Sequence, residues 1–140
     1  MAVQAEGSSN LIDNLNKEIF KIRTSKTVAD SISVDIPRNF YMAQQFMKNY
    51  HGRCIKVSDE AILAASSRLS QTYGLFAEPA AAAAYAGFRQ WQSEGKSAPN
   101  TKNVVLLTGS GLKDTDAIKS ILKKPEPILP DIQDLKTFLS

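Results

Sequence analysis

The stretch "NVVLLTGSGLKD", residues 103–114, decides the fold class of this chain. It begins with a run, Val104 to Leu107, that is apolar at every position, which is typical of a parallel strand buried on both faces. The run stops abruptly at Thr108 and Gly109. Because ligands in open parallel sheets collect at the carboxyl ends of strands, we predict a buried strand that carries a turn to a ligand site.

Strand and helix patterns alternate along the rest of the chain. Further strands are expected at 3–5 and 54–57, and helices at 10–20, 38–50, 59–73, 79–94, 116–124 and 132–139. Residues 24–37 have no helical period, and we expect them to be extended or irregular. This alternation predicts an α/β fold with a mostly parallel sheet flanked by helices.

Capping residues set the expected ends of several helices. Ser58 is a strong N-cap candidate, and Gly74 is expected to end the same helix. Pro79 suits the first position of the next helix, where an amide hydrogen has no partner in any case. We also expect Gly52 to be the C-cap glycine of the helix at 38–50, and Thr115 to cap the helix at 116–124.

Length and composition are those of one globular domain. The chain has 140 residues, of which 43% are apolar and 22% charged, so disorder is not expected. The longest uncharged, alanine-rich stretch, residues 79–88, is far shorter than the roughly 20 apolar residues of a membrane span. We therefore expect no membrane partner.

Charge, cysteine and histidine content bear on nucleic-acid binding, cellular location and metal binding. The net charge of +3 comes from lysines and arginines scattered among acidic residues, which indicates a solvated surface and no nucleic-acid partner. The single cysteine, Cys54, cannot form an internal disulfide, so a cytoplasmic location is expected. His51 is the only histidine, and it lies in an unrelated context, so we expect no metal site.

The glycines of the opening stretch do not by themselves specify a phosphate loop. Asp114 stands where a dinucleotide fingerprint has its third glycine, and it also follows Lys113 where a nucleotide-hydrolase loop has serine or threonine. On spacing alone, residues 108–111 indicate a tight turn. Likewise, Glu78 ahead of Pro79 indicates a favourable charge at a helix N-terminus.

Five segments together carry a family resemblance. They are "AVQAEGSS", "TVADSISVDIPRN", "IKVSDEAILAA", "GLFAEPAAAAAYAGF" and "VVLLTGSGLKD". Their order and intervals resemble those of threonine synthase, a pyridoxal-phosphate enzyme of the tryptophan-synthase-like fold (fold type II). The resemblance implies that residues 1–124 form the C-terminal part of such a catalytic domain, and that residues 125–140 form a tail with a short helix.

The resemblance also implies which cofactor contacts this chain makes. Thr108 matches the threonine whose hydroxyl hydrogen-bonds the pyridine nitrogen of pyridoxal phosphate, and Gly109 would let the backbone approach the ring closely. Ala29 matches a segment that passes beside the cofactor. Glu78 and Glu6 match motif positions that would support the residues in contact with the cofactor.

No catalytic residue is expected in this chain. Family members carry the Schiff-base lysine, and most of the residues that bind the cofactor phosphate, in the N-terminal half of the enzyme. Lys26 and Lys113 do not lie in the family's lysine context. The N-terminal half of the same enzyme is therefore the expected partner, and the chain alone is expected to be inactive.

The function implied by the resemblance is conversion of O-phosphohomoserine and water to threonine and phosphate, so a small amino acid is the expected substrate. Another fold type II lyase or β-replacement enzyme, of the cysteate-forming or diaminopropionate-cleaving type, stays open as an alternative. So does a non-catalytic binding or assembly module. Self-association into a homo-oligomer is a further arrangement that the sequence allows.

Overall fold

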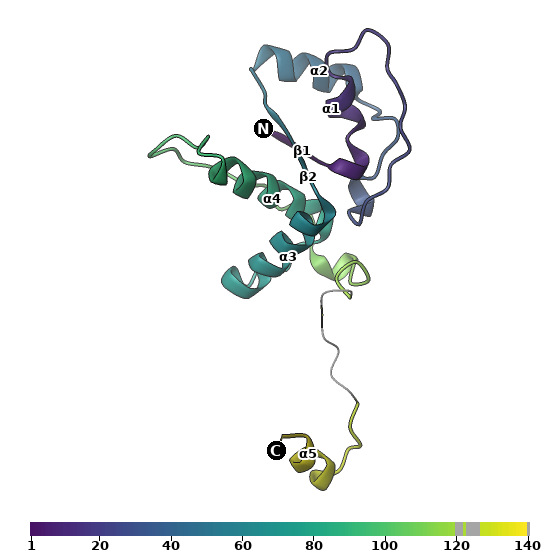
Figure 1. The fold of residues 1–140 in the computed structure, drawn as a ribbon, viewed down its shortest axis with the longest axis vertical. Coiled ribbons are helices and arrows are strands. Elements are labelled where there is room, and N and C mark those ends of the chain that lie inside the picture. The colour runs from purple at the N-terminus through teal and green to yellow at the C-terminus, as the bar shows by residue number, and fades with distance from the viewer. Residues whose placement is uncertain (120–121, 123–126, 140) are drawn as a thin grey trace.

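The computed structural model describes residues 1–119, 122 and 127–139 (Figure 1). Its elements, where η marks a short 3₁₀ helix, are β1 (Ala2–Ala5), η1 (Glu6–Ser8), α1 (Asn10–Asn14), η2 (Asp30–Ile32), α2 (Phe40–Asn49), β2 (Cys54–Val57), α3 (Asp59–Tyr73), α4 (Pro79–Ser93), η3 (Gly111–Lys113) and α5 (Ile132–Leu139). Helices α1 and α2 lie between the two strands, and α3 and α4 follow β2 with no strand between them.

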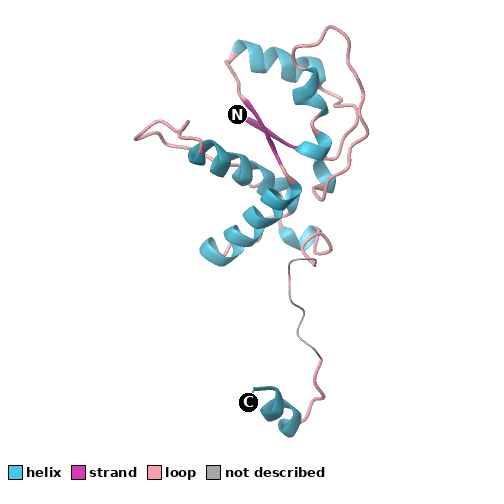
Figure 2. Ribbon diagram, in the orientation of Figure 1, coloured by secondary structure: helices cyan, strands magenta, loops and turns pink. Residues whose placement is uncertain are grey.

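The two strands form a parallel sheet. β1 pairs with β2, with Ala2 opposite Cys54 at the start of the register (Figure 2). Helix α4 contacts both strands and also α3. A Cβ placed on Gly87 of α4 would lie only 2.5 Å from the Val3 side chain, so glycine at this position lets the helix approach β1 closely. The α/β class, with parallel strands and flanking helices, is confirmed.

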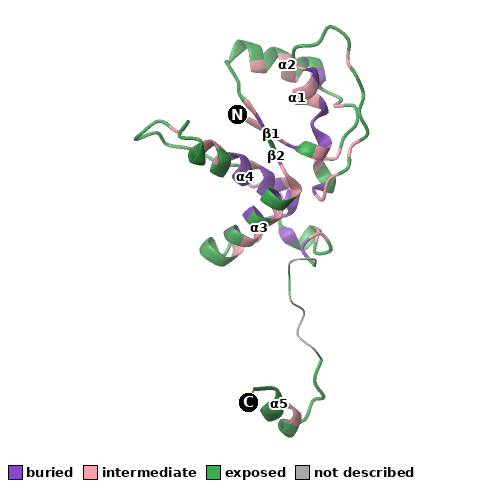
Figure 3. Ribbon diagram, viewed as in Figure 1, coloured by how far each residue is buried: buried purple, intermediate pink, exposed green. Residues whose placement is uncertain are grey.

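The core lies between α3, α4 and the sheet (Figure 3). Helix α3 contributes Ile62 and Leu69, which are buried. Helix α4 contributes a face of small residues, including the buried alanines at positions 81, 82, 83 and 86. Because these side chains are short, the two helices can pack closely, and the alanine-rich sequence serves as a packing face.

Local capping chemistry confirms the expected ends of α3 and α4. The Ser58 hydroxyl accepts a hydrogen bond from the Ala61 amide at 3.2 Å. Gly74 ends α3 in the left-handed conformation, with φ of 67°. Pro79 occupies the first turn of α4, where its missing amide hydrogen is not needed.

The expected C-cap glycine of α2, Gly52, is not the residue in the left-handed conformation at the end of this helix. The residue with positive φ is His51, at 51°, and the Gly52 amide bonds back to the Met47 carbonyl at 2.7 Å. A Cβ at position 52 would lie 2.6 Å from the Met47 sulfur. A larger residue here would have to displace the flexible end of the Met47 side chain.

The predicted helix at 10–20 is wrong in its second half, because α1 ends at Asn14. The Asn14 side chain accepts from the Lys21 amide at 2.8 Å and donates to the Lys21 carbonyl at 3.0 Å. These bonds fold the chain back on itself and leave Ile19 and Ile22 exposed. The periodic apolar pattern continues past the point where a buried asparagine ends the helix.

The segment 104–107 is extended, but the prediction of a paired strand buried on both faces is wrong. Val104 and Leu106 are 86% and 72% exposed, whereas Val105 and Leu107 pack against the core. In the part of the chain that the structure describes, β1 and β2 pair only with each other. One face of this segment therefore packs against the core and the other face is exposed.

The predicted helix at 116–124, capped by Thr115, is also not observed. Residues 115–119 form turns, and the Asp114 carboxylate accepts from the Ala117 amide at 3.3 Å. Residues 120, 121, 123 and 124 lie outside the described residues.

The short helix expected in the tail is confirmed as α5, Ile132–Leu139. Among the described residues, no helix is both long and apolar enough to cross a membrane.

Candidate functional site

The turn that follows residues 104–107 lies against the start of α4. The Glu78 amide donates to the Gly109 carbonyl at 3.1 Å, and the Gly111 amide donates to the Phe76 carbonyl at 2.9 Å. An antiparallel bridge between Ala77 and Ser110 lies between these bonds. The structure therefore brings together the Thr108 turn and the Glu78 motif, which are about thirty positions apart in the sequence.

Both glycines of this turn are explained by neighbours within the chain. A Cβ at Gly109 would lie 1.9 Å from Glu78 Oε1, and a Cβ at Gly111 would lie 2.3 Å from the Phe76 ring. Any larger residue would have to displace a partly or fully buried side chain. The expectation that Gly109 admits the cofactor ring stays a prediction, because the neighbour observed at its Cα is Glu78.

The Thr108 side chain is exposed at the end of the extended segment. It borders a hollow of about 250 Å³ that Leu75, Leu107 and Ser110 also line. Among the described residues, no hydrogen bond is made by its hydroxyl group. A neutral hydroxyl that is exposed and unpaired can donate to an unprotonated ring nitrogen, so this donor fits the pyridine nitrogen that the family resemblance implies.

Ala29 is fully buried, and the residues before it are fastened to the first turn of α3. The Thr27 hydroxyl donates to the Asp59 carboxylate, and the Val28 amide donates to the other Asp59 oxygen at 3.1 Å. The Ala29 amide in turn donates to the Thr27 hydroxyl at 3.2 Å. The sequence does not reveal this role of Asp59, because a carboxylate in a first helical turn is already explained by its favourable charge on the helix dipole.

A polar cavity of about 400 Å³ lies between the residues that follow Ala29 and the end of η3. Its lining residues come from η2, from the start of α4 and from the end of η3: Asp30, Ser31, Glu78, Lys113 and Asp114. Glu78 is only 8% exposed. The residues that follow Ala29 and the residues at the end of η3 therefore line one polar cavity together with Glu78. Thr108 and Gly109 line the separate hollow described above.

Glu6 does not join this group. Its side chain is exposed, and it lines neither the Thr108 hollow nor the polar cavity. It follows β1, and its backbone carbonyl accepts from the Arg23 guanidinium and from the Ser9 hydroxyl.

Lys113 and Lys26 lie in different parts of the structure. Lys113 lines the polar cavity with an exposed side chain. Lys26 is exposed, and its amide donates to the Gly7 carbonyl at 2.9 Å. Neither is desolvated, although a lysine needs desolvation or a cationic neighbour to be nucleophilic at neutral pH.

Known proteins are similar to this chain over most of its length. The family model described as "Pyridoxal-phosphate dependent enzyme" matches residues 1–109. The threonine synthase of Halalkalibacterium halodurans is 33% identical over 136 residues, which are 97% of this chain and 36% of that protein. The threonine synthase of Methanocaldococcus jannaschii is 31% identical over 140 residues, which are 98% of this chain and 35% of that protein. The chain thus spans about a third of the length of these relatives.

A solved structure shows the same fold. The crystal structure of a threonine deaminase from T.th. superposes with a TM-score of 0.55 and 18% sequence identity, covering 66% of this chain and 30% of that chain. At this identity the likeness concerns the fold alone.

Proposed function

The chain belongs to the family of pyridoxal-phosphate-dependent enzymes, and from this premise we propose that it supplies the Thr108 side of the active site in a threonine-synthase-type enzyme. The whole enzyme would convert O-phosphohomoserine and water to threonine and phosphate. Similarity to threonine synthases along 97% and 98% of this chain supports that reaction.

The observation that carries the proposal is the Thr108 hydroxyl, which makes no hydrogen bond among the described residues and lies on a turn that contacts between Glu78 and Gly109 hold in place. Pyridoxal phosphate, when bound, supplies an electron sink that stabilises carbanions. Thr108 would donate a hydrogen bond to its ring nitrogen without placing a full charge there. The Ala29 segment, whose next residues Asp30 and Ser31 line the polar cavity with Glu78, would flank the cofactor.

Glu78 would act on the turn and not on the cofactor directly. Its amide bonds the Gly109 carbonyl, and its carboxyl group packs against Gly109. Both contacts fix the backbone immediately after Thr108. For Glu6, the proposed supporting role rests on the family resemblance alone, since its side chain lies away from this cavity.

The covalent link to the cofactor would come from another part of the enzyme, which is also the partner that we propose for this chain. Neither Lys26 nor Lys113 has the desolvated surroundings that such a lysine needs. The cytoplasm is the compartment that we propose, since Cys54 is a single free cysteine in this sequence.

The proposal is tested with the full-length product of the gene, purified in the presence of pyridoxal phosphate. Release of phosphate from O-phosphohomoserine is measured together with threonine formation by amino-acid analysis. We expect equal amounts of the two products. Sulfite-dependent conversion of O-phosphoserine, or cleavage of diaminopropionate, without threonine formation would assign another reaction, and no cofactor binding would favour an assembly module.

A further inference from the structure

The polar cavity beside η2 and η3 contains a buried carboxylate, that of Glu78, which has no partner among the described residues. Glu78 is only 8% exposed, and its carboxyl group makes neither a hydrogen bond nor an ion pair within this part of the chain. It does not cap α4 either. Because a carboxylate that is removed from water is normally paired, the Glu78 carboxyl group is suited to receive a cation.

The oxygens of this carboxyl group open onto the polar cavity. Among the described residues, no side-chain oxygen or nitrogen that is shut off from solvent lacks a hydrogen-bond partner. The unpaired Glu78 oxygens are therefore not shut off, and the polar cavity is the space that Glu78 lines. Its volume of about 400 Å³ falls within the roughly 300 to 1,000 Å³ of small-molecule sites. A small ligand can thus reach Glu78.

The charges around the cavity favour a ligand that carries an ammonium group. Asp30 and Asp114 add two carboxylates to that of Glu78. The Asp114 carboxylate already accepts from the Ala117 amide at 3.3 Å, which leaves Glu78 as the unengaged buried acceptor. Within the described part of the chain, no three acidic, histidine or cysteine side chains are placed to hold a metal ion. An ammonium group needs only separate hydrogen-bond acceptors for its three donors.

Lys113 adds a cation to the same cavity. Its side chain is exposed, and it forms no ion pair with Glu78 or with any other residue that the structure describes. The two opposite charges therefore stay apart at one cavity. A ligand that carries both an ammonium and a carboxylate group can pair with both of them, and an amino acid is a ligand of this kind.

We propose that the polar cavity binds the charged head group of a free amino acid. Glu78 accepts a hydrogen bond from the ammonium group, and Lys113 donates one to the carboxylate. Binding is noncovalent and places the head group beside the Thr108 turn, which Glu78 contacts. The inference rests on the proposed function for its choice of an amino acid as ligand, and L-threonine, the product of the proposed reaction, is the probe.

Calorimetric titration of the full-length product of the gene with L-threonine tests the proposal. The protein is loaded with pyridoxal phosphate and reduced with borohydride beforehand, so that the cofactor no longer reacts with amines and only noncovalent binding is measured. Two analogues separate the two charges of the ligand. 3-Hydroxybutyrate lacks the ammonium group, and L-threoninamide lacks the carboxylate.

Glu78→Gln removes the charge and keeps the size of the side chain that packs against Gly109. L-Threonine and L-threoninamide should bind about tenfold more weakly or less, the usual effect of losing a charged hydrogen-bond partner, whereas 3-hydroxybutyrate should bind as before. The matched control, Glu60→Gln, removes an exposed carboxylate of α3 outside the cavity and should change none of the three affinities. An equal loss for all three ligands, or no loss for L-threonine, would overturn the role of Glu78.

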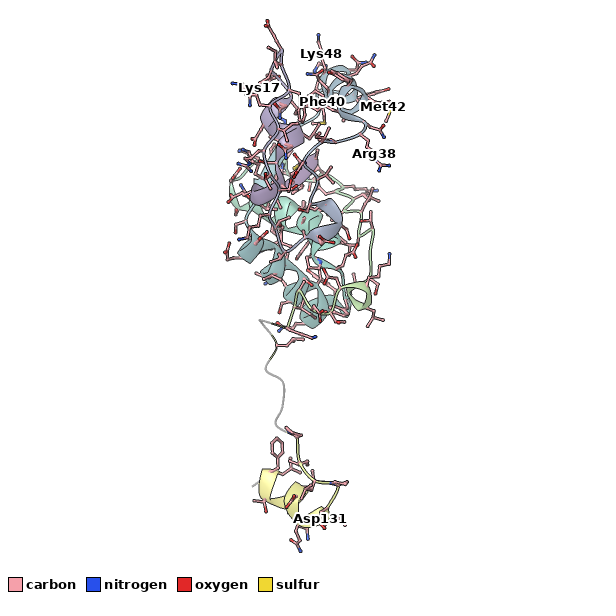
Figure 4. The ribbon with its side chains drawn as sticks, turned by 90° about the vertical axis from the view of Figure 1, so that its right-hand side faces the viewer. Lys17, Arg38, Phe40, Met42, Lys48 and Asp131 are labelled. Carbon is pink, nitrogen blue, oxygen red and sulfur yellow. The ribbon has the colours of Figure 1, made fainter. Side chains whose placement is uncertain are left out.

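Lys113→Met should give the complementary result. L-Threonine and 3-hydroxybutyrate should bind more weakly, and L-threoninamide should bind as before. Lys48→Met is the matched control, since Lys48 is exposed and lies on α2, far from η3 in both views (Figures 1 and 4). An unchanged affinity of Lys113→Met for L-threonine would contradict the pairing with the carboxylate.

Failure of the head-group site can be told apart from failure of the proposed function. Threonine formation from O-phosphohomoserine, combined with an L-threonine affinity that Glu78→Gln leaves unchanged, would contradict the head-group site alone. Selective loss of ammonium recognition in Glu78→Gln without threonine formation would contradict the proposed reaction alone. If the protein binds no cofactor, the same titrations are made without reduction. An unmodified protein that binds L-threonine no better than 3-hydroxybutyrate would overturn the inference in either case.

Discussion

The carboxyl group of Glu78 fills the space that a side chain at Gly109 would need. A Cβ on Gly109 would lie 1.9 Å from Glu78 Oε1, and the Glu78 amide also donates to the Gly109 carbonyl at 3.1 Å. The start of α4 and the turn after Thr108 therefore form one unit. A change at either Glu78 or Gly109 should alter the packing of the other.

Gly109→Ala should destabilise the protein by about 1 to 3 kcal/mol, the usual cost of overpacking a filled site. The added methyl group must displace the Glu78 carboxyl group toward the polar cavity that Glu78 borders, and so breaks its packing against Gly109. Urea unfolding followed by circular dichroism measures the loss.

The control for this prediction is the double variant. In a Glu78→Ala background the space beside Gly109 is open, so Gly109→Ala should cost at least about 1 kcal/mol less there, as residues in contact couple in double-mutant cycles. Equal costs in the two backgrounds would show that the Glu78 carboxyl group does not limit position 109.

Thr108→Val should weaken cofactor binding while leaving folding intact. The Thr108 side chain is exposed and its hydroxyl has no hydrogen bond within the described residues. The free energy of unfolding should therefore change by less than about 0.5 kcal/mol. Loss of one hydrogen bond to the ring nitrogen should reduce the affinity for pyridoxal phosphate roughly threefold to tenfold, as measured by absorbance titration.

Thr108→Ser serves as the matched control, because it keeps the hydroxyl and removes only a methyl group. Its cofactor affinity should stay close to that of the unmodified protein. If Thr108→Val and Thr108→Ser bind the cofactor equally well, the hydroxyl does not contact the ring nitrogen.

Asp59→Ala should loosen the segment that carries Ala29. The Asp59 carboxylate accepts from the Thr27 hydroxyl and from the Val28 amide, so its removal leaves two donors without a partner. The expected loss is about 2 kcal/mol in the free energy of unfolding, with faster hydrogen exchange at Val28. Glu60→Ala removes an acidic residue from the same helical turn and should cost clearly less. A similar loss in the free energy of unfolding for both variants would mean that Asp59 acts only through its charge on the helix dipole.

The ion pair between Asp13 and Lys56 should make stability depend on pH in the acid range. The Lys56 ammonium lies 2.6 Å from Asp13 Oδ1, and this hydrogen bond lowers the pKa of Asp13 below its ordinary value of 3.8. A carboxyl group whose pKa is lower in the folded state stabilises the fold above its unfolded pKa, and this stabilisation is lost as pH falls through the folded pKa.

Lys56→Met should therefore reduce the pH dependence of urea unfolding below about pH 4, where the ordinary Asp pKa lies. Lys48→Met, a change on the neighbouring helix α2, is the matched control and should leave the pH dependence unchanged. An unchanged profile for Lys56→Met would mean that the Asp13 carboxyl group is not coupled to Lys56 in solution.

Elements with ends set by local chemistry could be predicted from the sequence. The Ser58 cap and Gly74 fix α3, Pro79 begins α4, and the alternation in residues 54–57 marks β2. Each of these signals acts within a few residues of the chain, so the sequence around it contains the cause.

Elements that depend on distant contacts could not be predicted. The Asn14 side chain folds the chain back onto Lys21, although the apolar period continues past it. The segment 104–107 has the composition of a buried strand, yet pairing needs a neighbour that its own sequence cannot reveal.

The site was predictable only in part. The resemblance singles out Thr108, Gly109, Ala29 and Glu78. The structure places Thr108 and Gly109 beside Glu78, and Ala29 is buried next to Asp30, which lines the polar cavity with Glu78. Their contacts with the cofactor stay predictions. The sequence cannot reveal that Asp59 holds the Ala29 segment, because the helix dipole alone explains a carboxylate in the first turn of a helix.

The position of the covalent link to the cofactor tests the proposed site most directly. The protein as its gene encodes it is incubated with pyridoxal phosphate, reduced with borohydride and mapped by peptide mass spectrometry. We predict one modified lysine outside residues 1–140, with the yield unchanged by Lys26→Ala or Lys113→Ala. A pyridoxyl group on Lys26, on Lys113 or on any other lysine within these residues would contradict the proposed division of the active site.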